Sequence, residues 1–509
     1  LNLGARWDII FPETVNGLGH GGFASLTTGG IRVAGAAGFG TNGNQRMDYT
    51  NVAARFGISY QATPRTVIRA GGGQVYDTVG YFGSLYGSVL SHNLPVQIDE
   101  SQNQSGSLGA YVTTLAAPPV RPNAPTIPTN GVIPFQDAYS QTFRGERIQL
   151  PRVHQYNLAV QQQLSNNMTL EVAYVGNLGD RIYPGETFGT DLNAPVLPNS
   201  PTQLAAGSNI RRPYYNKFVG TYQGAATICC SNGMTSAAPN GRAIYNSLQT
   251  KLDKRFHNGL QFNANYTWSR ASNFDNNEAF TNYRQVTWGR NDTNRSNIFV
   301  FSGMYELPFG KNRMFLSGVS RLENLLIGGW SLSGQTTWES GRPFTPTYAE
   351  CGADQDIDNN FANPGISSEC RPNGSPLGFG TSVAGLNTTS HARQFFTPVA
   401  ALATNGATSG AWTRPAFGTF GNTPRNGLVG PRDYFADASV MKDFPITERF
   451  KGQFQFQAFN VFNHAALDIP TATNSRCIDC TVAQGAGAIT SLEPNSTMRR
   501  LQFAAKVTF

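Results

Sequence analysis

The sequence predicts an all-β protein, an antiparallel transmembrane β-barrel with long connections at one rim and short ones at the other. Three observations support this fold class. Apolar and polar residues alternate over long segments, long and short connections alternate between those segments, and no apolar run reaches the roughly 18 residues of a transmembrane helix. Charged residues make up only 14% of the 509 residues, and aromatic residues reach 11%. Average soluble domains carry about 25% charged residues.

Alternation with a period of two residues predicts the strands. The segment LQFNANYTW, residues 260–268, has an apolar or aromatic residue at every second position. Twelve strands are predicted, at residues 1–10, 52–60, 66–76, 153–164, 169–176, 243–256, 260–270, 296–307, 328–340, 435–444, 449–460 and 497–509. Most have the roughly 9–11 residues that cross a bilayer at a tilt, whereas strands of soluble proteins average about 5–6 residues.

The connections alternate in length without exception. Turn formers make up short connections such as Ser165–Met168 and His257–Gly259, and one of middling length covers 308–327. The long ones cover 11–51, 77–152, 177–242, 271–295, 341–434 and 461–496. Outer-membrane barrels have short periplasmic turns and long extracellular loops. If the first strand runs outward, the twelfth runs inward and Phe509 lies at the periplasmic rim. A soluble β-sandwich or barrel with an apolar core is the less favoured alternative.

The polar residues of the strands are expected to line the inside of the barrel. They are Arg55, Gln161, Gln163, Lys251, Arg255, Gln453, Gln455, Gln457, Arg500 and Lys506. The formal net charge of +7 is spread along the chain without a basic run, so no nucleic-acid partner is predicted. The chain begins at Leu1 inside a strand-like segment, and we expect it to be part of a longer protein.

Six long motifs carry a resemblance to a known family. They are NVAARFGISYQATPRTVIRAGGGQVYD (51–77), QYNLAVQQQLSNNMTLEVAYVGNLGDR (155–181), YNSLQTKLDKRFHNGLQFNANYTWSRA (245–271), FSGMYELPFGKNR (301–313), GGWSLSGQTTWESGRPFT (328–345) and FADASVMKDFPITERFKGQFQFQAFNVFNHAAL (435–467). In this order they resemble the carboxy-terminal barrel of the TonB-dependent, Oar-like outer-membrane receptors. These receptors carry a carboxypeptidase-regulatory-like domain and are abundant in acidobacteria and related Gram-negative bacteria. The resemblance covers most of residues 45–509.

This resemblance implies a signal peptide, a regulatory-like β-sandwich, a plug domain and a barrel of 22 strands. Residues 1–509 would then be one domain, the last twelve or so strands of that barrel, and this chain lacks the plug and the sandwich. A closed twelve-stranded barrel is the alternative, since even strand numbers are allowed.

The implied function is energised uptake or export of a large or scarce solute across the outer membrane of a Gram-negative bacterium. The implied partners are outer-membrane lipid, the TonB complex through the plug, and a solute, peptide or carbohydrate ligand. An outer-membrane adhesin or structural barrel and a passive porin are the alternatives, because both would share the fold.

Motifs of common enzyme centres are absent from the sequence. It contains no GxSxG, no P-loop and no HExxH, and its six histidines are isolated. We therefore predict that the protein is not an enzyme and has no catalytic residues.

The cysteines form three local pairs in predicted loops: Cys229 with Cys230, Cys351 with Cys370, and Cys477 with Cys480. An even number in a secreted context favours disulfides, and Cys351–Cys370 is the favoured one. Cys477 and Cys480 suit either a tight disulfide or half of a metal site, although no second Cys/His pair completes tetrahedral zinc. A disulfide between the adjacent Cys229 and Cys230 competes with free or cross-loop thiols.

A weak calcium candidate lies in DQDIDNN, where Asp354, Asp356 and Asp358 offer the hard oxygen ligands that Ca²⁺ prefers. The EF-hand pattern fails because its twelfth position is Gly365 and no helices flank the segment. A solvated acidic loop is the favoured interpretation, and no metal or cofactor is assigned.

The chain ends RRLQFAAKVTF, with Leu501, Phe503, Val507 and Phe509 on one face of an alternating strand. This ending resembles the signal that the barrel-assembly machinery reads in outer-membrane barrels. We therefore predict that these four residues face lipid and form an assembly signal.

Overall fold

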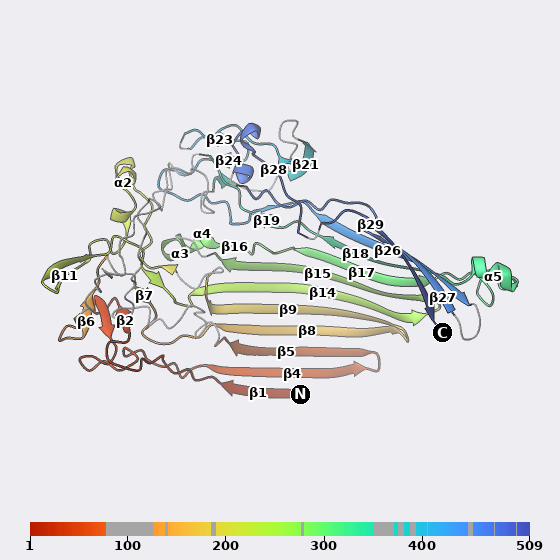
Figure 1. The fold of residues 1–509 in the computed structure, drawn as a ribbon, viewed down its shortest axis with the longest axis horizontal. Helices are drawn as coiled ribbons and strands as arrows, with labels where there is room; N and C mark the ends of the chain where they lie inside the picture. Colours follow the sequence, from red (N-terminus) through yellow and green to blue (C-terminus); the bar gives the residue numbers. More distant parts are fainter. Residues whose placement is uncertain are drawn as a thin grey trace, which may run out of the picture.

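The computed structural model describes residues 1–77, 126–137, 141–184, 190–275, 279–349, 371–374, 381–386, 393–404, 406–445, 451–472, 474–494 and 496–508. One antiparallel sheet dominates it (Figure 1). Twelve strands follow one path through this sheet: β1 (Asn2–Trp7), β4 (Val52–Thr63), β5 (Thr66–Tyr76), β8 (Arg152–Ser165), β9 (Met168–Ile182), β14 (Gly241–His257), β15 (Leu260–Phe274), β17 (Asn297–Glu306), β18 (Trp330–Glu339), β26 (Asp433–Pro445), β27 (Lys451–Phe459) and β29 (Arg500–Thr508). The short strand β16 (Trp288–Arg290) pairs with β15 beside this path.

The prediction of an antiparallel meander is confirmed, because the twelve strands lie side by side in the sheet in the order in which they occur along the chain. Each predicted segment overlaps one of the twelve strands, and the largest differences lie at the ends of two strands. β15 continues to Phe274, four residues beyond the predicted end. β9 continues to Ile182, six residues beyond it. The turn formers of GNLGD stay in the sheet because β8 and β14 pair with this segment from both sides.

Gly176 shows why glycine suits the interior of β9. A Cβ atom at this position would lie 2.1 Å from the ring of Tyr156 on the neighbouring strand. The ring of Tyr156 therefore fills the space that a side chain would need, so the glycine is required by packing within the sheet and does not mark a turn.

The two ends of the sheet differ, as Figure 1 shows. Two-residue connections join β4 to β5, β8 to β9 and β14 to β15 at one end, here called the turn end. A longer connection at this end contains α5 (Arg321–Ile327). The long connections gather at the opposite end, here called the loop end. The predicted alternation of long and short connections is observed with one exception, because the connection 307–329 at the turn end is as long as the connection 275–296 at the loop end.

The long connections fold together into what we call the loop assembly. A six-stranded sheet in it comprises β10 (Thr190–Asp191), β13 (Thr235–Ser236), β7 (Thr142–Phe143), β2 (Gly22–Ser25), β3 (Gly30–Val33) and β6 (Val132–Pro134). Further strands are β11 (Phe218–Tyr222), β12 (Ala225–Cys229), β19 (Pro343–Phe344), β20 (Asn373–Gly374), β21 (Thr381–Leu386), β22 (Arg393–Phe396), β23 (Thr408–Ser409), β24 (Trp412–Thr413), β25 (Leu428–Val429) and β28 (Ala488–Ile489). The helices are α2 (Pro201–Ala205), α3 (Ala279–Asn282), α4 (Arg284–Thr287) and the 3₁₀ turns η1 (Asn209–Arg211), η2 (Asn474–Arg476) and η3 (Val482–Gln484).

The hydrophobic core lies mainly in the loop assembly and not between layers of the large sheet. Ile31, Ile133, Phe135 and Met234 are among its fully buried residues. On the large sheet, by contrast, side chains such as Phe56, Leu158 and Phe503 are about half exposed or more. Within the described residues, no helix has the length and apolar character needed to span a bilayer.

Candidate functional site

One face of the large sheet is polar from β4 to β29, and we call it the polar face. Residues directly opposite each other in a sheet share a face, so the registers define its members. They are Arg55, Arg69, Gln161, Glu171, Gln249, Lys251, Asp253, Asn263, Asn265, Ser302, Gln335, Asp437, Ser439, Gln453, Gln455, Gln457, Gln502 and Lys506. The opposite face carries the apolar residues of the same strands, including Leu158, Tyr174 and Leu248.

Amide and hydroxyl groups bond to one another across the polar face. The Nε2 atom of Gln455 donates to Ser439 Oγ at 3.1 Å, and that of Gln453 donates to Asp443 Oδ1 at 2.9 Å. Four of its charged groups form two ion pairs, with 3.5 Å between Arg69 and Glu171 and 3.0 Å between Lys251 and Asp253. These pairs are about half exposed, so each adds little to stability. Their consequence is a surface that offers many hydrogen-bonding groups.

Two hollows lie along the polar face. One of about 870 Å³ is lined by Arg6, Arg55, Gln155, Asn157 and Asn177 among others. The other, of about 620 Å³, is lined by Asp253, Asn263, Gln335, Asp437 and Gln457 among others. Both linings supply amides and charges that could hydrogen-bond a polar solute.

Glycines shape the first hollow. A Cβ at Gly72 would lie 2.7 Å from the ring of Phe56, and one at Gly73 would lie 3.2 Å from Cβ of Arg55. The GGG sequence of β5 therefore lets neighbouring side chains approach the backbone from both faces. This agrees with the sequence interpretation that the glycines of RAGGGQ permit close approach and do not form a phosphate site.

Ion pairs of two arginines, which we call the arginine cluster, join the loop assembly to the loop end of the sheet. Arg295 lies 2.8 Å from Glu339, 3.2 Å from Asp433 and 3.0 Å from Glu493. Arg342 binds the same Glu493 at 2.9 Å and also pairs with Asp468. This cluster joins three long connections, 275–296, 340–432 and 460–499. Because all these side chains are at most about a quarter exposed, solvent screens the cluster less than it screens surface pairs.

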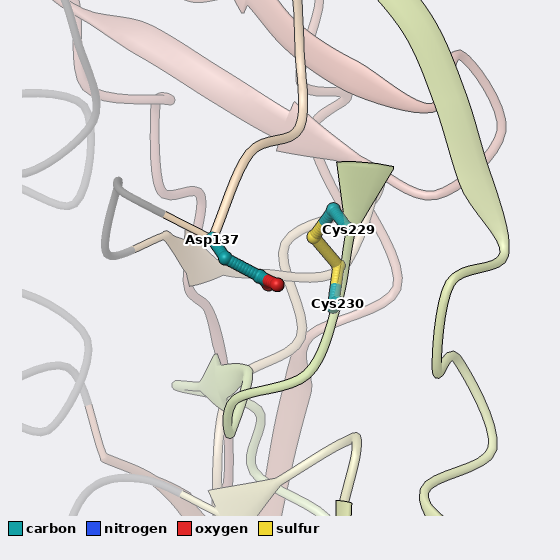
Figure 2. Close-up of side chains that lie close together, drawn as sticks. All are labelled: Asp137, Cys229 and Cys230. Carbon is teal, nitrogen blue, oxygen red and sulfur yellow. A yellow bond between two sulfur atoms is a disulfide. The ribbon is translucent and has the colours of Figure 1, made fainter. Parts of the chain in front are cut away.

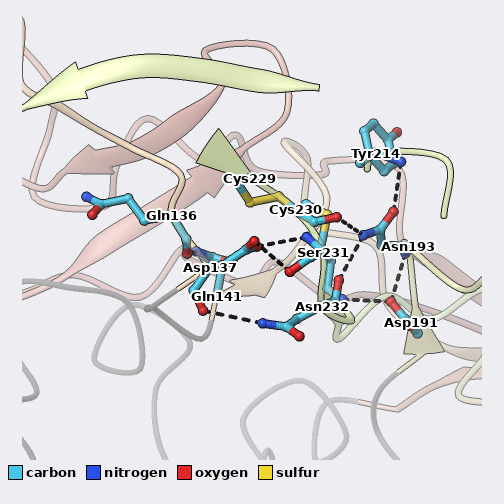
Figure 3. Close-up of a disulfide and its surroundings, with 11 residues drawn as sticks. Gln136, Asp137, Gln141, Asp191, Asn193, Tyr214, Cys229, Cys230, Ser231 and Asn232 are labelled. Carbon is cyan, nitrogen blue, oxygen red and sulfur yellow. Dashed lines mark hydrogen bonds between the residues drawn. A yellow bond between two sulfur atoms is a disulfide. The ribbon is translucent and has the colours of Figure 1, made fainter. Parts of the chain in front are cut away.

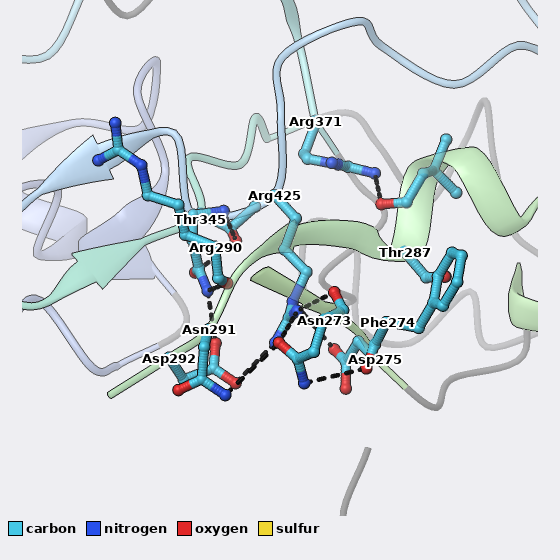
Figure 4. A network of polar contacts seen from close by, with 12 residues as sticks. Asn273, Phe274, Asp275, Thr287, Arg290, Asn291, Asp292, Thr345, Arg371 and Arg425 are labelled. Atoms are coloured by element: carbon cyan, nitrogen blue, oxygen red, sulfur yellow. Dashed lines mark hydrogen bonds and ion pairs between the residues drawn. The ribbon is translucent and has the colours of Figure 1, made fainter. Parts of the chain in front are cut away.

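A second polar network surrounds Arg425 (Figure 4). Its guanidinium, which is 3% exposed, lies 2.7 Å from Asp292 and 3.3 Å from the carbonyl oxygen of Asn273. The neighbouring Asn426 donates to the Arg290 carbonyl oxygen at 2.7 Å and to the Asp292 carboxylate at 2.6 Å. The segment around residue 425 is thereby held against the end of β15 and the connection that follows it.

A disulfide lies in the core of the loop assembly near the amino-terminal strands (Figures 2 and 3). It joins the adjacent Cys229 and Cys230, both buried. The backbone N–H and hydroxyl of Ser231 donate to the Asp137 carboxylate at 2.9 and 2.6 Å. Asn193 donates to the carbonyl oxygen of Cys230 at 3.0 Å. The sequence interpretation had left free or cross-loop thiols open here, and the structure has the disulfide.

Within the part of the chain that the structure describes, cysteine and aspartate side chains meet at two places that could suggest a metal centre, Asp137 with Cys229 and Cys230, and Asp479 with Cys477 and Cys480. The sulfur atoms of Cys477 and Cys480 are bonded at 2.02 Å. Cysteine binds a metal as a thiolate, and the sulfur atoms of both pairs are in disulfides, so neither pair offers a thiolate ligand. The carboxylate of Asp479 is moreover occupied, because it accepts the N–H groups of Ala349 at 2.8 Å and Leu402 at 3.0 Å.

The other predicted site residues fall into two groups. Leu501, Phe503 and Val507 lie on β29 with side chains 57 to 67% exposed, on the apolar face. Phe509, the cysteines Cys351 and Cys370 and the calcium candidates Asp354, Asp356 and Asp358 lie outside the described residues.

The ion pairs of the arginine cluster were not predicted from the sequence. Arg295 and Asp433 are 138 positions apart, and no local pattern marks a long-range pair. The one available signal was that arginines and acidic residues sit next to predicted strand ends.

Comparisons with known proteins extend this picture. A family described as an outer membrane beta barrel domain matches residues 1–502. Among curated proteins, none matches this sequence.

Similar solved structures include the outer membrane transporter YddB from Escherichia coli, with 9% identity over 90% of this chain and 40% of that one (TM-score 0.38). The siderophore receptor PirA from Acinetobacter baumannii gives 9% identity, 90% and 41% coverage and a TM-score of 0.37. For BauA, the ferric preacinetobactin receptor from Acinetobacter baumannii, the values are 8%, 91%, 36% and 0.35. The chain thus spans about two fifths of the length of these structures.

The match to the family model covers nearly the whole chain, and it agrees with the meander of long strands and its two unlike ends. The chain belongs to the outer membrane β-barrel domain family, and its location is the outer membrane.

Proposed function

We propose that this chain forms the carboxy-terminal part of the barrel of a TonB-dependent transporter of the Oar-like type. The loop assembly captures a large or scarce solute on the outside. The polar face lines the path, and a plug elsewhere in the protein opens that path when TonB transmits energy. The observation that carries this proposal is the polar face itself, which offers hydrogen-bonding groups from β4 to β29 beneath a folded loop assembly.

A barrel larger than these twelve strands is part of the proposal. Within the described residues, β1 and β29 end the path and do not pair with each other. Unpaired backbone N–H and C=O groups cost several kcal/mol each in lipid. We therefore infer that further strands close the barrel, to about the 22 that the resemblance implies. Residues 1–509 would belong to the barrel alone, and the plug and the β-sandwich to other parts of the protein.

Growth and uptake assays test this function. The gene is deleted in a strain with and without active TonB, and growth is compared on a panel of iron sources, peptides and polysaccharides. We expect slower growth of the deletion strain on at least one of these compounds. The strain without active TonB should show the same growth deficit, and deleting the gene in that strain should add nothing to it. If instead the purified full-length protein makes proteoliposomes swell in small sugars without energy, it is a passive porin and the proposal is wrong. If deletion affects only surface adhesion, the adhesin alternative holds.

A further inference from the structure

The connection between β17 and β18, residues 307–329, carries large apolar side chains that face outward. Met314 is 81% exposed, and Leu322 and Leu326 are each 76% exposed. Phe315 and Leu316 are about half exposed beside them. Leu322 and Leu326 are four positions apart on α5, so they lie on the same side of that helix. We call these five residues the α5 surface, and the connection that carries them lies at the turn end of the sheet (Figure 1).

Several contacts hold this connection in one conformation. Ser320 and Glu323 form a capping box at the start of α5. The side chain of Asn324 accepts the N–H of Lys311 at 2.6 Å, which fixes the turn before the helix. Phe309 packs against Phe315 with 5.7 Å between the ring centres. An ordered segment that turns its apolar side chains outward differs from a flexible linker, and it calls for something that covers it.

The apolar face of the sheet is connected to α5 through Trp330. Trp330 opens β18 and has the same orientation as Leu332, which pairs with Tyr305 on the apolar face. The indole N–H of Trp330 donates to the carbonyl oxygen of Leu326 at 2.8 Å. Tryptophan at a strand end is characteristic of the interface between hydrocarbon and headgroups. The last turn of α5 is therefore hydrogen-bonded to Trp330, a residue whose type and place at a strand end suit the membrane interface.

The charges of the same connection suit a headgroup layer. It contains three basic residues, Lys311, Arg313 and Arg321, and one acidic residue, Glu323. All four are exposed, and Arg313 also pairs with Glu306 at 3.0 Å, while Leu322 and Leu326 supply the apolar component. Segments that lie in the membrane interface combine an apolar side with basic residues that attract anionic lipids.

We propose that residues 307–329 anchor the barrel in the leaflet next to the turn end, with the α5 surface inserted among the lipid headgroups. The partner is the anionic phospholipid surface. The anchor lies outside the solute path, so it does not depend on the proposed transport function.

Site-directed spin labelling tests this. Single cysteines replace Leu322 or Leu326 in the full-length protein, which is reconstituted in phosphatidylethanolamine and phosphatidylglycerol vesicles. The label's collision rates with oxygen, which concentrates in lipid, and with a water-soluble nickel chelate are then compared. Val219→Cys in β11 is the matched control, since Val219 is an apolar residue of the loop assembly that is 73% exposed. The parent protein, treated with the same reagent, reports labelling of native cysteines.

We expect the oxygen-to-nickel ratio at positions 322 and 326 to exceed that at position 219 severalfold, and to fall when phosphatidylcholine replaces phosphatidylglycerol. A ratio equal to that of the control would overturn the proposal. Protection from nickel that disappears when the protein is diluted in lipid would also overturn it, because a second copy would then cover the α5 surface. All three substituted side chains are exposed, so the variants should fold. Normal resistance to heat and protease confirms that they do.

Discussion

Arg295 and Asp433 lie 3.2 Å apart at the loop end of the sheet, although they are 138 positions apart in the chain. The side chain of Asp433 is 1% exposed and that of Arg295 is 14% exposed. The same guanidinium also serves Glu339 and Glu493. One positive charge thus holds three carboxylates that come from two strands and a long connection. Arg295 therefore joins the ends of β18 and β26 to the connection between β27 and β29.

Arg295→Ala should therefore destabilise the folded protein strongly. The change leaves buried carboxylates without their cation, which typically costs about 3–5 kcal/mol. Thermal unfolding of the purified protein in detergent, followed by the heat-dependent gel shift of barrels, measures the loss. Arg69→Ala is the control, because the exposed pair Arg69–Glu171 should contribute at most about 1 kcal/mol. Equal unfolding temperatures for the two variants would contradict the stabilising role of the Arg295 ion pairs.

Asp48 should make stability depend on pH in the acid range. Its burial raises the pKa of the carboxyl, but hydrogen bonds from Thr50 and the charges of Arg147 and Arg181 outweigh that effect, so the pKa is lowered below its usual 3.8. A lowered pKa stabilises the folded state fully above the unfolded value. This contribution is then lost as the pH falls through the folded value.

The measurement compares the parent protein with Asp48→Asn from pH 7 downward. We expect the parent to be more stable by a constant amount down to about pH 4, because model carboxyls titrate near there. The difference should then shrink at lower pH. A difference that stays constant below pH 3 would show that the charge of Asp48 has no role.

The strands of the large sheet could be predicted because each has one apolar and one polar side over many residues. Lipid outside and polar groups inside impose this alternation on every strand, so the signal repeats twelve times. It fails at the end of β9, where turn-forming residues such as Gly179 remain in the sheet because strands pair on both sides.

The loop assembly could not be predicted by the same means. β2 is buried at all four of its positions, so it shows no alternation, and its parallel partner β7 lies more than a hundred residues further on. Arg425 likewise gives no local sign that it will meet Asp292. These features depend on long-range packing, which one sequence does not display.

Asp479 offers a test of how the loop assembly is held together. Its carboxylate accepts N–H groups from two connecting segments, at Ala349 and Leu402. Asp479→Ala leaves two donors unpaired, of which the N–H of Leu402 is buried and that of Ala349 is partly buried. An unpaired buried group costs about 1–3 kcal/mol. We expect faster proteolysis of the loop assembly in intact cells with unchanged amounts of barrel in the membrane. Asp253→Ala on the polar face is the control. Unchanged proteolysis would show that Asp479 does not hold these connections together.

The chain's last residue allows the proposed assembly signal to be tested. Phe509→Ala should lower the amount of protein that the assembly machinery inserts, without changing any ligand binding by the molecules that reach the surface. Quantitative surface labelling together with a binding assay separates the two effects. Thr508→Ala is the control, since Thr508 belongs to the polar side of the alternation. Normal surface levels of the Phe509 variant would tell against the signal.

The two sides of β29 should respond oppositely to a positive charge. Phe503 packs against Phe456 on the apolar face, with 5.0 Å between ring centres, while its neighbour Gln502 lies opposite Gln457 on the polar face. An arginine on the lipid side of a barrel costs about 2–4 kcal/mol near the bilayer midplane. Phe503→Arg should therefore reduce the folded fraction in the membrane sharply, and Gln502→Arg should not. Both variants add the same charge to the same strand, so a difference between them measures which face meets lipid. If Gln502→Arg proved the more damaging change, the assignment of the two faces would be reversed.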